Sequence, residues 1–584
     1  MFRTLDAIAA DATYDVIVVG AGGGGLAAAV FAAIEGKKVL VVERTEYVGG
    51  TTALSAATTW IPNSQHAGRV ATDDSPEKVR RFLDQVVGNH SAPAMRDAFI
   101  ESGPEAIAKL EAETDAHFQP YPTHPDYEQE AEGATLRGRA LEPVPFDGRA
   151  LGADIGRIRP PIPEFTLFNG MMIDRTDIGH LLAMKKSWRS ARHAARILGR
   201  YAIDRMKGSR GTRLVMGNAL IGRLLLTARR KGCDFLLETS VTGFLTDEGG
   251  VSGVSLKQGS LTRDVKARLG VVLAAGGFNR HPQRRSELLP DPVPQYSPGA
   301  PGHTGEMQDL AIGLGARLGE GNLDNAFWAP VSIRKRPDGS TAVFPHFVLD
   351  RSKPGTVCVD RTGHRFVNES ISYHRFSRAM FEANRTRPTI PCYIVTDAVG
   401  LRKYGLGMVR MGTRNIRPYL ADGYLTEAAT IADLARKIGV DPANLETTIA
   451  RMNDYARIGT DPEFGRGVTP YHRVNGDASF SGPNPTLGPI ATAPFYAVAL
   501  YPGDIGAATG LVIDEWAEVL DRDNQPIGRL YACGNEANSV MGGTYPGPGI
   551  TVGPAITFAY RAIRHAVGKA GAAPARQKRR SSVR

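Results

Sequence analysis

The sequence predicts an α/β fold, with a discontinuous Rossmann-like domain and a second, α+β domain. Three observations lead to this prediction. A chain of 584 residues is too long for a single hydrophobic core. Its segment 14–44 reads as a strand, a glycine turn, a helix and a second strand. Near the other end, the loop TYPGPG leads from a further strand into an apolar helix. We therefore expect the two ends of the chain to form one domain and the middle to form the other.

The N-terminal segment YDVIVVGAGGGGLAAAVFAAIEGKKVLVVER contains a dinucleotide-binding pattern. Gly20, Gly22 and Gly25 fit GxGxxG, which permits a tight turn, close approach of the backbone to a pyrophosphate, and close helix–strand packing. The helix start then directs free N–H groups at the phosphates. Glu43 ends the second strand and is placed to accept hydrogen bonds from a ribose hydroxyl. The uncharged span Val16–Ile34 is long enough for a membrane helix, but the strand–turn–helix pattern is the better interpretation.

Glycine-rich segments further along favour FAD over a soluble nicotinamide cofactor. The loop RTEYVGGTTALSAATTW offers room for a second phosphate contact and a floor for a flat ring. A later strand, RLGVVLAAGGFNR, ends at Gly276 and Gly277, where we expect the backbone to contact the ligand again. Taken alone, this glycine pair or the pair in VGG is explained by an ordinary turn. The expected FAD contacts are Gly20, Gly22, Gly23, Gly24, Gly25, Glu43, Arg44, Gly50, Thr51, Thr52, Ser55, Val241, Ala275, Gly276, Asn279, Gly534, Asn535, Glu536, Gly549, Ile550 and Val552.

The C-terminal loop TYPGPG has an unusual composition for a helix entrance. Pro546 and Pro548 fix φ without supplying N–H groups, while Gly547 and Gly549 let the backbone approach a ligand. The helix that follows is expected to aim its first N–H groups at the flavin edge that gains negative charge on reduction. We interpret the loop as a stiff, thin wall between flavin and substrate; a plain helix cap is the alternative.

Four segments together resemble the 3-ketosteroid Δ1-dehydrogenases, FAD enzymes of the fumarate-reductase-like superfamily. They are GAGGGGLAAAVFAA, VGGTTALSAATTWIP, FVLDRSKPGTVCVDRTGHRFVNES and GTYPGPGITVGPA. The resemblance covers residues 14–183 and 214–567. It implies 1,2-dehydrogenation of a 3-oxosteroid, in which a tyrosine takes the C2 proton and flavin N5 receives the C1 hydride. The expected setting is bacterial sterol or steroid degradation, with an external electron acceptor that the sequence does not identify.

The resemblance also assigns catalytic roles. Tyr545 and the N–H of Gly549 would bind the C3 carbonyl oxygen as it becomes enolate-like, and Tyr373 of NESISY would accept the C2 proton. A phenol with a pKa of about 10 is a poor base at neutral pH, so it needs help from a neighbour. Tyr127 of HPDYEQE is the expected helper, and Tyr121 remains its rival.

The stretch 185–213 departs from the family pattern. It holds ten Lys or Arg against one acid, so much of the net charge of +10 is local. At helical spacing one face holds Trp188, Ala191, Ala195, Leu198 and Ala202, and a neighbouring stripe holds Lys185, Arg189, Arg192, Arg196 and Arg200. A basic amphipathic helix with a Trp is typical of a membrane interface. A packing arm is the alternative; nucleic-acid binding is disfavoured because no recognition motif accompanies the charges. We expect a cytoplasmic protein, with contact at the inner face of the cell membrane left open.

The expected domains follow from these segments. Residues 1–282 form the N-terminal part of the FAD-binding domain, with the basic insertion inside it. Residues 283–484 form the substrate domain, 485–572 complete the FAD-binding domain, and 573–584 are a disordered basic tail. The enzymatic rivals are an ene reductase of the fumarate or urocanate type and a 3-oxosteroid 4-dehydrogenase; a membrane-docked flavin carrier is the non-enzymatic rival. We expect no metal site and free cysteine thiols, because the four cysteines form no CxxC pair.

Overall fold

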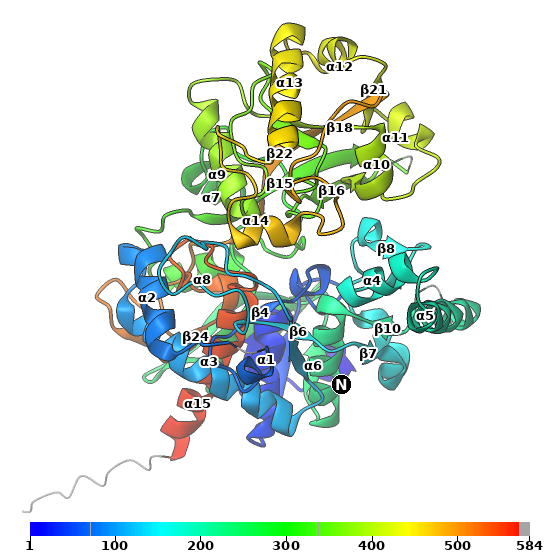
Figure 1. Cartoon of the computed structure of the whole chain (residues 1–584). Helices are drawn as coiled ribbons and strands as arrows, with labels where there is room; N and C mark the ends of the chain where they lie inside the picture. Colours follow the sequence, from blue (N-terminus) through cyan, green and yellow to red (C-terminus); the bar gives the residue numbers. More distant parts are fainter. Residues whose placement is uncertain (71, 209, 337, 572–584) are drawn as a thin grey trace, which may run out of the picture.

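The chain folds into two bodies, each built on its own β-sheet (Figure 1). The computed structural model describes residues 1–70, 72–208, 210–336 and 338–571, so the expected basic tail 573–584 lies outside the described residues. The first body holds the N-terminus and the C-terminal helix, and the middle of the chain forms the second (Figure 1). This arrangement agrees with the α/β fold class that the sequence predicts.

A nine-stranded sheet forms the first body. Its centre is parallel and buried on both faces, which explains the near-continuous apolar runs DVIVV and VLVV. Its strands, in spatial order, are β1 (Phe2–Arg3), β11 (Asp234–Leu236), β3 (Val39–Val42), β2 (Thr13–Val19), β14 (Leu261–Leu273), β13 (Gly250–Gln258) and β12 (Ser240–Asp247), with β24 (Pro526–Ala532) paired to β14 and β23 (Glu518–Leu520) paired to β24.

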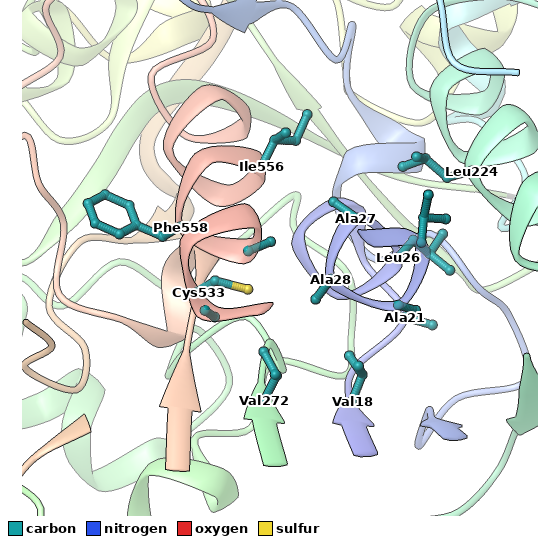
Figure 2. Close-up of a cluster of buried hydrophobic side chains, with 14 of the residues drawn as sticks. Val18, Ala21, Leu26, Ala27, Ala28, Leu224, Val272, Cys533, Ile556 and Phe558 are labelled. Carbon is teal, nitrogen blue, oxygen red and sulfur yellow. The ribbon is translucent and has the colours of Figure 1, made fainter. Parts of the chain in front are cut away.

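Helix α1 (Gly23–Ile34) brings the two ends of the chain together. It packs against α6 (Met216–Arg230) on one side and α15 (Val552–Gly571) on the other (Figure 2). Its small residues permit this close packing: a Cβ at position 25 would lie 1.9 Å from the Gly20 carbonyl oxygen. The other helices of this body are α2 (Pro76–Val86), α3 (Pro93–Glu113) and α8 (Glu306–Gly313), whereas α7 (Pro282–Leu288) lies with the second body (Figure 1).

A six-stranded antiparallel sheet forms the second body. Its strands are β16 (Thr341–Pro345), β15 (Ala326–Lys335), β22 (Phe495–Ala507), β18 (Cys392–Asp397) and β17 (Thr356–Val359), with β21 (Thr426–Ala428) also paired to β22. Its helices are α9 (Tyr373–Asn384), α10 (Ala398–Tyr404), α11 (Arg417–Ala421), α12 (Ile431–Ile438), α13 (Pro442–Ile458) and α14 (Pro470–Asn475). The predicted C-terminal part of the FAD-binding domain, residues 485–572, includes β22. The prediction is wrong for this strand, because β22 pairs with β15 and β18 and so belongs to the second sheet. Strand pairing depends on segments distant in sequence, which local patterns do not reveal.

Two helices stand at the edge of the first body: α4 (Arg175–Ala183), which precedes the basic insertion 185–213, and α5 (Trp188–Lys207), which lies within it (Figure 1). The buried face of α5 is Ser190, Ala194, Ile197, Tyr201 and Asp204. This buried face differs from the apolar face that the sequence predicts, which begins at Trp188. Two contacts select the observed face: Tyr201 donates a hydrogen bond to the Phe168 carbonyl, and Asp204 accepts one from Thr212 N–H. Trp188 is 83% exposed. The outward face of α5 is therefore the one that carries the Trp.

Two further expectations concern the whole chain. None of the helices in the described ranges combines the length and apolar composition that crossing a bilayer requires. The span Val16–Ile34 is most of β2, the glycine turn and α1. All four cysteines are buried, and they are free, as their spacing predicts.

The remaining strands form short sheets. They are β4 (Thr59–Trp60) with β6 (Ala140–Pro143) and β5 (Phe118–Pro120), β7 (Phe146–Asp147) with β10 (Arg213–Leu214), β8 (Thr166–Leu167) with β9 (Met171–Met172), and β19 (Gly405–Leu406) with β20 (Val409–Arg410).

A buried ion network joins β4 and β6 to the loop between β5 and β6. Arg139 contacts Asp74 at 2.6 Å and Asp126 at 2.8 Å, and all three side chains are 1% exposed. Asp126 also accepts a hydrogen bond from the Trp60 indole at 2.9 Å. Because both acids share one cation, removing that cation leaves two buried charges without a partner.

We therefore expect Arg139→Met to lower the free energy of unfolding of the holoenzyme by about 3–5 kcal/mol, the usual cost of breaking a buried pair. Urea unfolding followed by circular dichroism measures this change. The matched control is Arg80→Met, whose arginine pairs with Asp97 at the surface with side chains 39% and 43% exposed. That control should lose about 1 kcal/mol at most. Equal losses in the two variants would contradict a special role for the buried network.

Candidate active site

One continuous cavity of 920 Å³ is lined by residues of both bodies. The first body contributes the glycine turn after β2, the end of β3 and the segment after β14, which are carboxyl ends of neighbouring parallel strands. This is where open α/β sheets bind ligands. The second body contributes Phe344, Phe347 and Tyr471, and α4 contributes Arg175 and Ile178.

The glycine turn has the shape that a dinucleotide requires. A Cβ on Gly22 would meet nothing within 4 Å, so its backbone opens directly to the cavity. Gly20 has a φ of +102°, and a Cβ there would lie 2.4 Å from the Ala274 carbonyl oxygen, so only glycine fits. Glu43 lines the cavity and accepts a hydrogen bond from Ala21 N–H at 2.9 Å, which fixes its carboxylate beside the turn. These residues fit the adenosine side of FAD.

Most of the expected FAD contacts line this cavity. They are Gly20, Gly22, Gly23, Gly24, Glu43, Arg44, Gly50, Thr51, Thr52, Ser55, Val241, Ala275, Gly276, Gly534, Asn535, Gly549 and Val552. Four of the expected residues stand behind the lining. Gly25 packs on Gly20, and Ile550 is buried in the core. Asn279 donates a hydrogen bond to Asp504, and Glu536 accepts one from Gly277 N–H.

The TYPGPG loop presents unbonded donors to the cavity. Tyr545 and Gly549 both line it. Gly549 has a φ of +95°, and a Cβ there would lie 2.2 Å from the Thr58 carbonyl oxygen. Its own carbonyl accepts a hydrogen bond from Trp60 N–H at 3.2 Å. Within the described part of the chain, the N–H groups of residues 549–552 have no protein acceptor. The loop therefore combines a phenol with free backbone donors at the start of α15.

Three expected tyrosines come together beside this loop. The Tyr127 ring stacks on the Tyr545 ring with centroids 5.6 Å apart, and the Tyr373 ring lies 5.1 Å from Tyr545. The Tyr127 hydroxyl donates a hydrogen bond to the Tyr373 hydroxyl at 3.3 Å. The rival, Tyr121, contacts His124 and Arg175 instead and does not line the cavity. The geometry favours Tyr127 as the partner of Tyr373.

Burial keeps these phenols neutral at rest. It raises the pKa of Tyr545 to about 12 and the pKa values of Tyr373 and Tyr127 well above their usual range. The neighbouring phenols raise the pKa of Tyr373 further, because each would repel its phenolate. A neutral Tyr545 can donate a hydrogen bond to a carbonyl oxygen. Tyr373 must be aided if it is to accept a proton near neutral pH.

Tyr471 of the cavity lining was not predicted, and further contacts hold His374 and Tyr127 in place. Tyr471 lines the cavity with its ring 5.1 Å from Tyr127, and nothing local in the sequence marks it. His374, beside Tyr373, accepts a hydrogen bond from Trp328 N–H and contacts Asp324 at 3.0 Å, so it has a positioning role. The backbone N–H of Tyr127 donates to the Pro546 carbonyl at 2.8 Å, which ties the tyrosine to the loop.

Comparisons with known proteins agree with this geometry. The family model described as "FAD binding domain" matches residues 15–552. The chain is 35% identical to a 4-oxocyclohex-2-ene-1-carboxylate 5-dehydrogenase of Sinomonas cyclohexanicum, over 94% of this chain and 93% of that one. It is 34% identical to a 3-oxosteroid 1-dehydrogenase of Mycobacterium tuberculosis, over 96% and 99% of the two chains.

Among solved structures, the crystal structure of the 3-ketosteroid Δ1-dehydrogenase of Sterolibacterium denitrificans in complex with 1,4-androstadiene-3,17-dione superposes with a TM-score of 0.89. It is 34% identical and covers 95% of this chain and 100% of that one. These matches confirm the expected FAD cofactor and fold. The chain belongs to the 3-ketosteroid Δ1-dehydrogenase family and is an FAD-dependent oxidoreductase.

Proposed function

We propose that this enzyme introduces a C1–C2 double bond into 3-oxosteroids. The observation that carries the proposal is the convergence of Tyr545, the unbonded N–H of Gly549 and Tyr373 on one cavity. The relative from Mycobacterium tuberculosis is a 3-oxosteroid 1-dehydrogenase, and the solved structure binds a steroid dienone, which supports the same reaction here. FAD, when bound, supplies the acceptor for the hydride that leaves C1.

Tyr545 and Gly549 have the arrangement of an oxyanion site. The phenol and the N–H come from one stiff turn, so both reach the same carbonyl oxygen without reorganising. Their hydrogen bonds strengthen as the C3 oxygen gains negative charge, and this makes the C2 proton more acidic. The pKa of Tyr545, raised to about 12 by burial, keeps its proton in place for this role.

Tyr373 is then the acceptor of the C2 proton. The Tyr127 hydroxyl lies 3.3 Å from the Tyr373 hydroxyl and is placed to donate to the phenolate once it forms, because a donor favours the charged state of its acceptor. In the resting site the contacts with Tyr127 raise the pKa of Tyr373. Tyr373 begins α9, and the Ser372 side chain caps that helix by accepting a bond from Arg375 N–H. The catalytic phenol therefore stands on a rigid element of the second body.

A compact cyclic keto acid is the second candidate substrate, because the relative from Sinomonas cyclohexanicum acts on a cyclohexenone carboxylate. The cavity favours the larger steroid. Phe165 and the α4 residues Ile178 and Leu182 extend its apolar lining. The fused rings of a steroid can contact this extended apolar lining, whereas a single cyclohexanone ring leaves most of the lining without contact.

We also propose that the insertion docks on an anionic membrane surface. The cations Lys185, Lys186, Arg189, Arg192 and Arg196 are exposed and have no ion-pair partner within the described ranges. Trp188 stands among them, and Leu182 is 64% exposed while also lining the cavity. The cavity therefore opens beside this surface. Basic side chains around an exposed Trp match the charge and depth of a lipid headgroup layer.

The first test of the reaction uses the oxidised holoenzyme with 4-androstene-3,17-dione in the absence of oxygen. We expect bleaching of the flavin absorbance and formation of the 1,4-diene, because the enzyme removes hydrogens from C1 and C2. Tyr545→Phe should keep its FAD but react about 10²–10³-fold more slowly, the usual cost of losing one oxyanion donor. The control Tyr531→Phe removes a phenol from β24, outside the cavity lining, and should react like the wild type. A product desaturated elsewhere, or normal turnover by Tyr545→Phe, contradicts the proposal.

The second test concerns the pH dependence of kcat/KM. Because the pKa of Tyr373 is raised, its ionised fraction is small near neutrality and grows about tenfold per pH unit below that pKa. We expect kcat/KM of the wild type to rise between about pH 7 and 9. The same rise should be absent from the profile of Tyr373→Phe. The variant should also lose about 10²–10⁴-fold in rate. A flat wild-type profile, or the same slope in both proteins, removes Tyr373 from the role of base.

The third test measures binding to lipid vesicles with and without phosphatidylserine. The triple variant R189E/R192E/R196E should lose at least about 3 kcal/mol of binding to the anionic vesicles, at about 1 kcal/mol per charge. The control R385E/R436E/R457E changes the net charge equally at exposed arginines of the second body. Its binding should stay close to that of the wild type. Equal loss in both variants would show that net charge, and not this surface, is responsible.

A further inference from the structure

An arginine without a partner faces the cavity on the side away from Tyr545. Arg175 is the first residue of α4, is exposed, and lines the cavity. Its guanidinium lies 5.1 Å from the centre of the Tyr121 ring and makes no hydrogen bond or ion pair with any described residue. Its charge lowers the pKa of His124 and opposes the rise at Tyr127, but it is not among the influences on Tyr545. Arg175 therefore lines the cavity beside Tyr121 and His124, whereas Tyr545 lines it from the loop before α15.

The acids beside Arg175 are already engaged by other groups. Asp177 is buried and contacts Arg213 and His193, each at 2.7 Å. Asp174 caps α4 by accepting a hydrogen bond from Asp177 N–H and lies 3.4 Å from Arg213. Glu142 feels the charge of Arg175 from beyond ion-pair distance and does not line the cavity. The positive charge at this end of the cavity is therefore not neutralised by a direct contact.

The other arginines of the cavity lining, unlike Arg175, have hydrogen-bond or ion-pair partners in the described part of the protein. Four arginines line it among the described residues. Arg44 contacts Glu306 and Arg159 donates to Thr45, both beside the adenosine side. Arg410 donates to the backbone carbonyls of Glu164 and Pro163. Arg175 is thus the cavity arginine left to bind a ligand.

Two buried polar groups of the cavity lining also lack a hydrogen-bond partner among the described residues, and the charge of Arg175 lowers the pKa of one and opposes the rise in the pKa of the other. The Tyr471 hydroxyl is buried without a hydrogen-bond partner, although the residue is only 3% exposed and lines the cavity. Nδ1 of His124 is likewise buried and unbonded, and the ring lines the cavity. A buried hydroxyl or imidazole without a partner is costly, so such groups are usually satisfied by a ligand or water. Both are able to donate a hydrogen bond to an oxygen.

We propose that Arg175, Tyr471 and His124 form a subsite for a carboxylate at the end of the substrate cavity away from Tyr545. The inference rests on the proposed function, because it concerns a ketone whose carbonyl is held at Tyr545. The substrate class is then a ring ketone with a carboxylate remote from the carbonyl, and not a wholly neutral steroid. Arginine suits this role because its planar fork binds both carboxylate oxygens. The carboxylate comes either from the side chain of a steroid acid or from a compact cyclohexanone carboxylate.

The test compares three ketones with the holoenzyme: 4-androstene-3,17-dione, 3-oxo-4-androstene-17β-carboxylate and 4-oxocyclohexanecarboxylate. We expect one of the two acids to have a higher kcat/KM than the dione, through a lower KM. Arg175→Gln should lower kcat/KM for that acid about tenfold, the worth of one charge-assisted hydrogen bond, and leave the dione unchanged. Arg175→Lys, which keeps the charge, should retain part of the preference. The acid whose kcat/KM falls in Arg175→Gln identifies the substrate class as either a steroid acid or a compact cyclohexanone carboxylate.

A second readout does not depend on turnover. If the steroid acid responds, the dienone product 3-oxo-1,4-androstadiene-17β-carboxylate is titrated against the flavin absorbance. For the compact acid, the titration uses cyclohexanecarboxylate, which has no ketone to oxidise and so leaves the flavin oxidised. The Kd of the acid titrated should rise about tenfold in Arg175→Gln. The control Arg436→Gln removes an exposed arginine of α12 and should change neither Kd nor selectivity. Equal loss for acid and dione in Arg175→Gln, or no preference for either acid in the wild type, overturns the subsite. Failure of the wild type to oxidise any of the three ketones contradicts the proposed function instead.

Discussion

The site depends on how closely the turn from Tyr545 to Gly549 is held against β4. Backbone meets backbone there: a Cβ on Gly549 would lie 2.2 Å from the Thr58 carbonyl, and one on Gly547 would lie 2.5 Å from the Trp60 indole nitrogen. Two prolines restrict the same turn without adding donors. The turn therefore presents the Tyr545 hydroxyl and the Gly549 N–H to the cavity. They keep their direction because the turn has no space in which to relax, and fixed donors are what makes an oxyanion site effective.

The turn also links parts of the chain that are far apart in sequence. Its Pro546 carbonyl accepts the backbone N–H of Tyr127, and Asp126, the residue before, binds the Trp60 indole and Arg139. Tyr545, Tyr127 and the ion network thus form one unit of the first body. Tyr373 comes from the second body, at the start of α9. The proposed catalytic set is complete only where the two bodies meet, so the proposed mechanism depends on the packing between them.

Much of this arrangement could be predicted from the sequence, for a physical reason. The glycine turn after β2 and the TYPGPG loop need particular residues because their own backbones need positive φ or have no room for a side chain, and such needs are visible locally. The pairing of β22 was missed because strand partners are set by distant segments. The buried face of α5 was offset for the same reason, since Phe168 and Thr212 select it. Nothing near Tyr471 or Arg175 in the sequence indicates that they line the same cavity.

Burial raises the pKa of both phenols of the proposed mechanism, which helps the role of one and opposes the role of the other. It favours the donor, because a raised pKa holds the Tyr545 proton where a carbonyl oxygen needs it. It opposes the base, because the same desolvation disfavours the Tyr373 phenolate. A buried base of this kind accepts a proton only from a carbon that has become acidic. The C2 position becomes acidic only while Tyr545 and Gly549 hold the C3 oxygen. Proton removal is therefore coupled to correct binding of the ketone, and a ligand without a carbonyl at that position leaves Tyr373 protonated and inert.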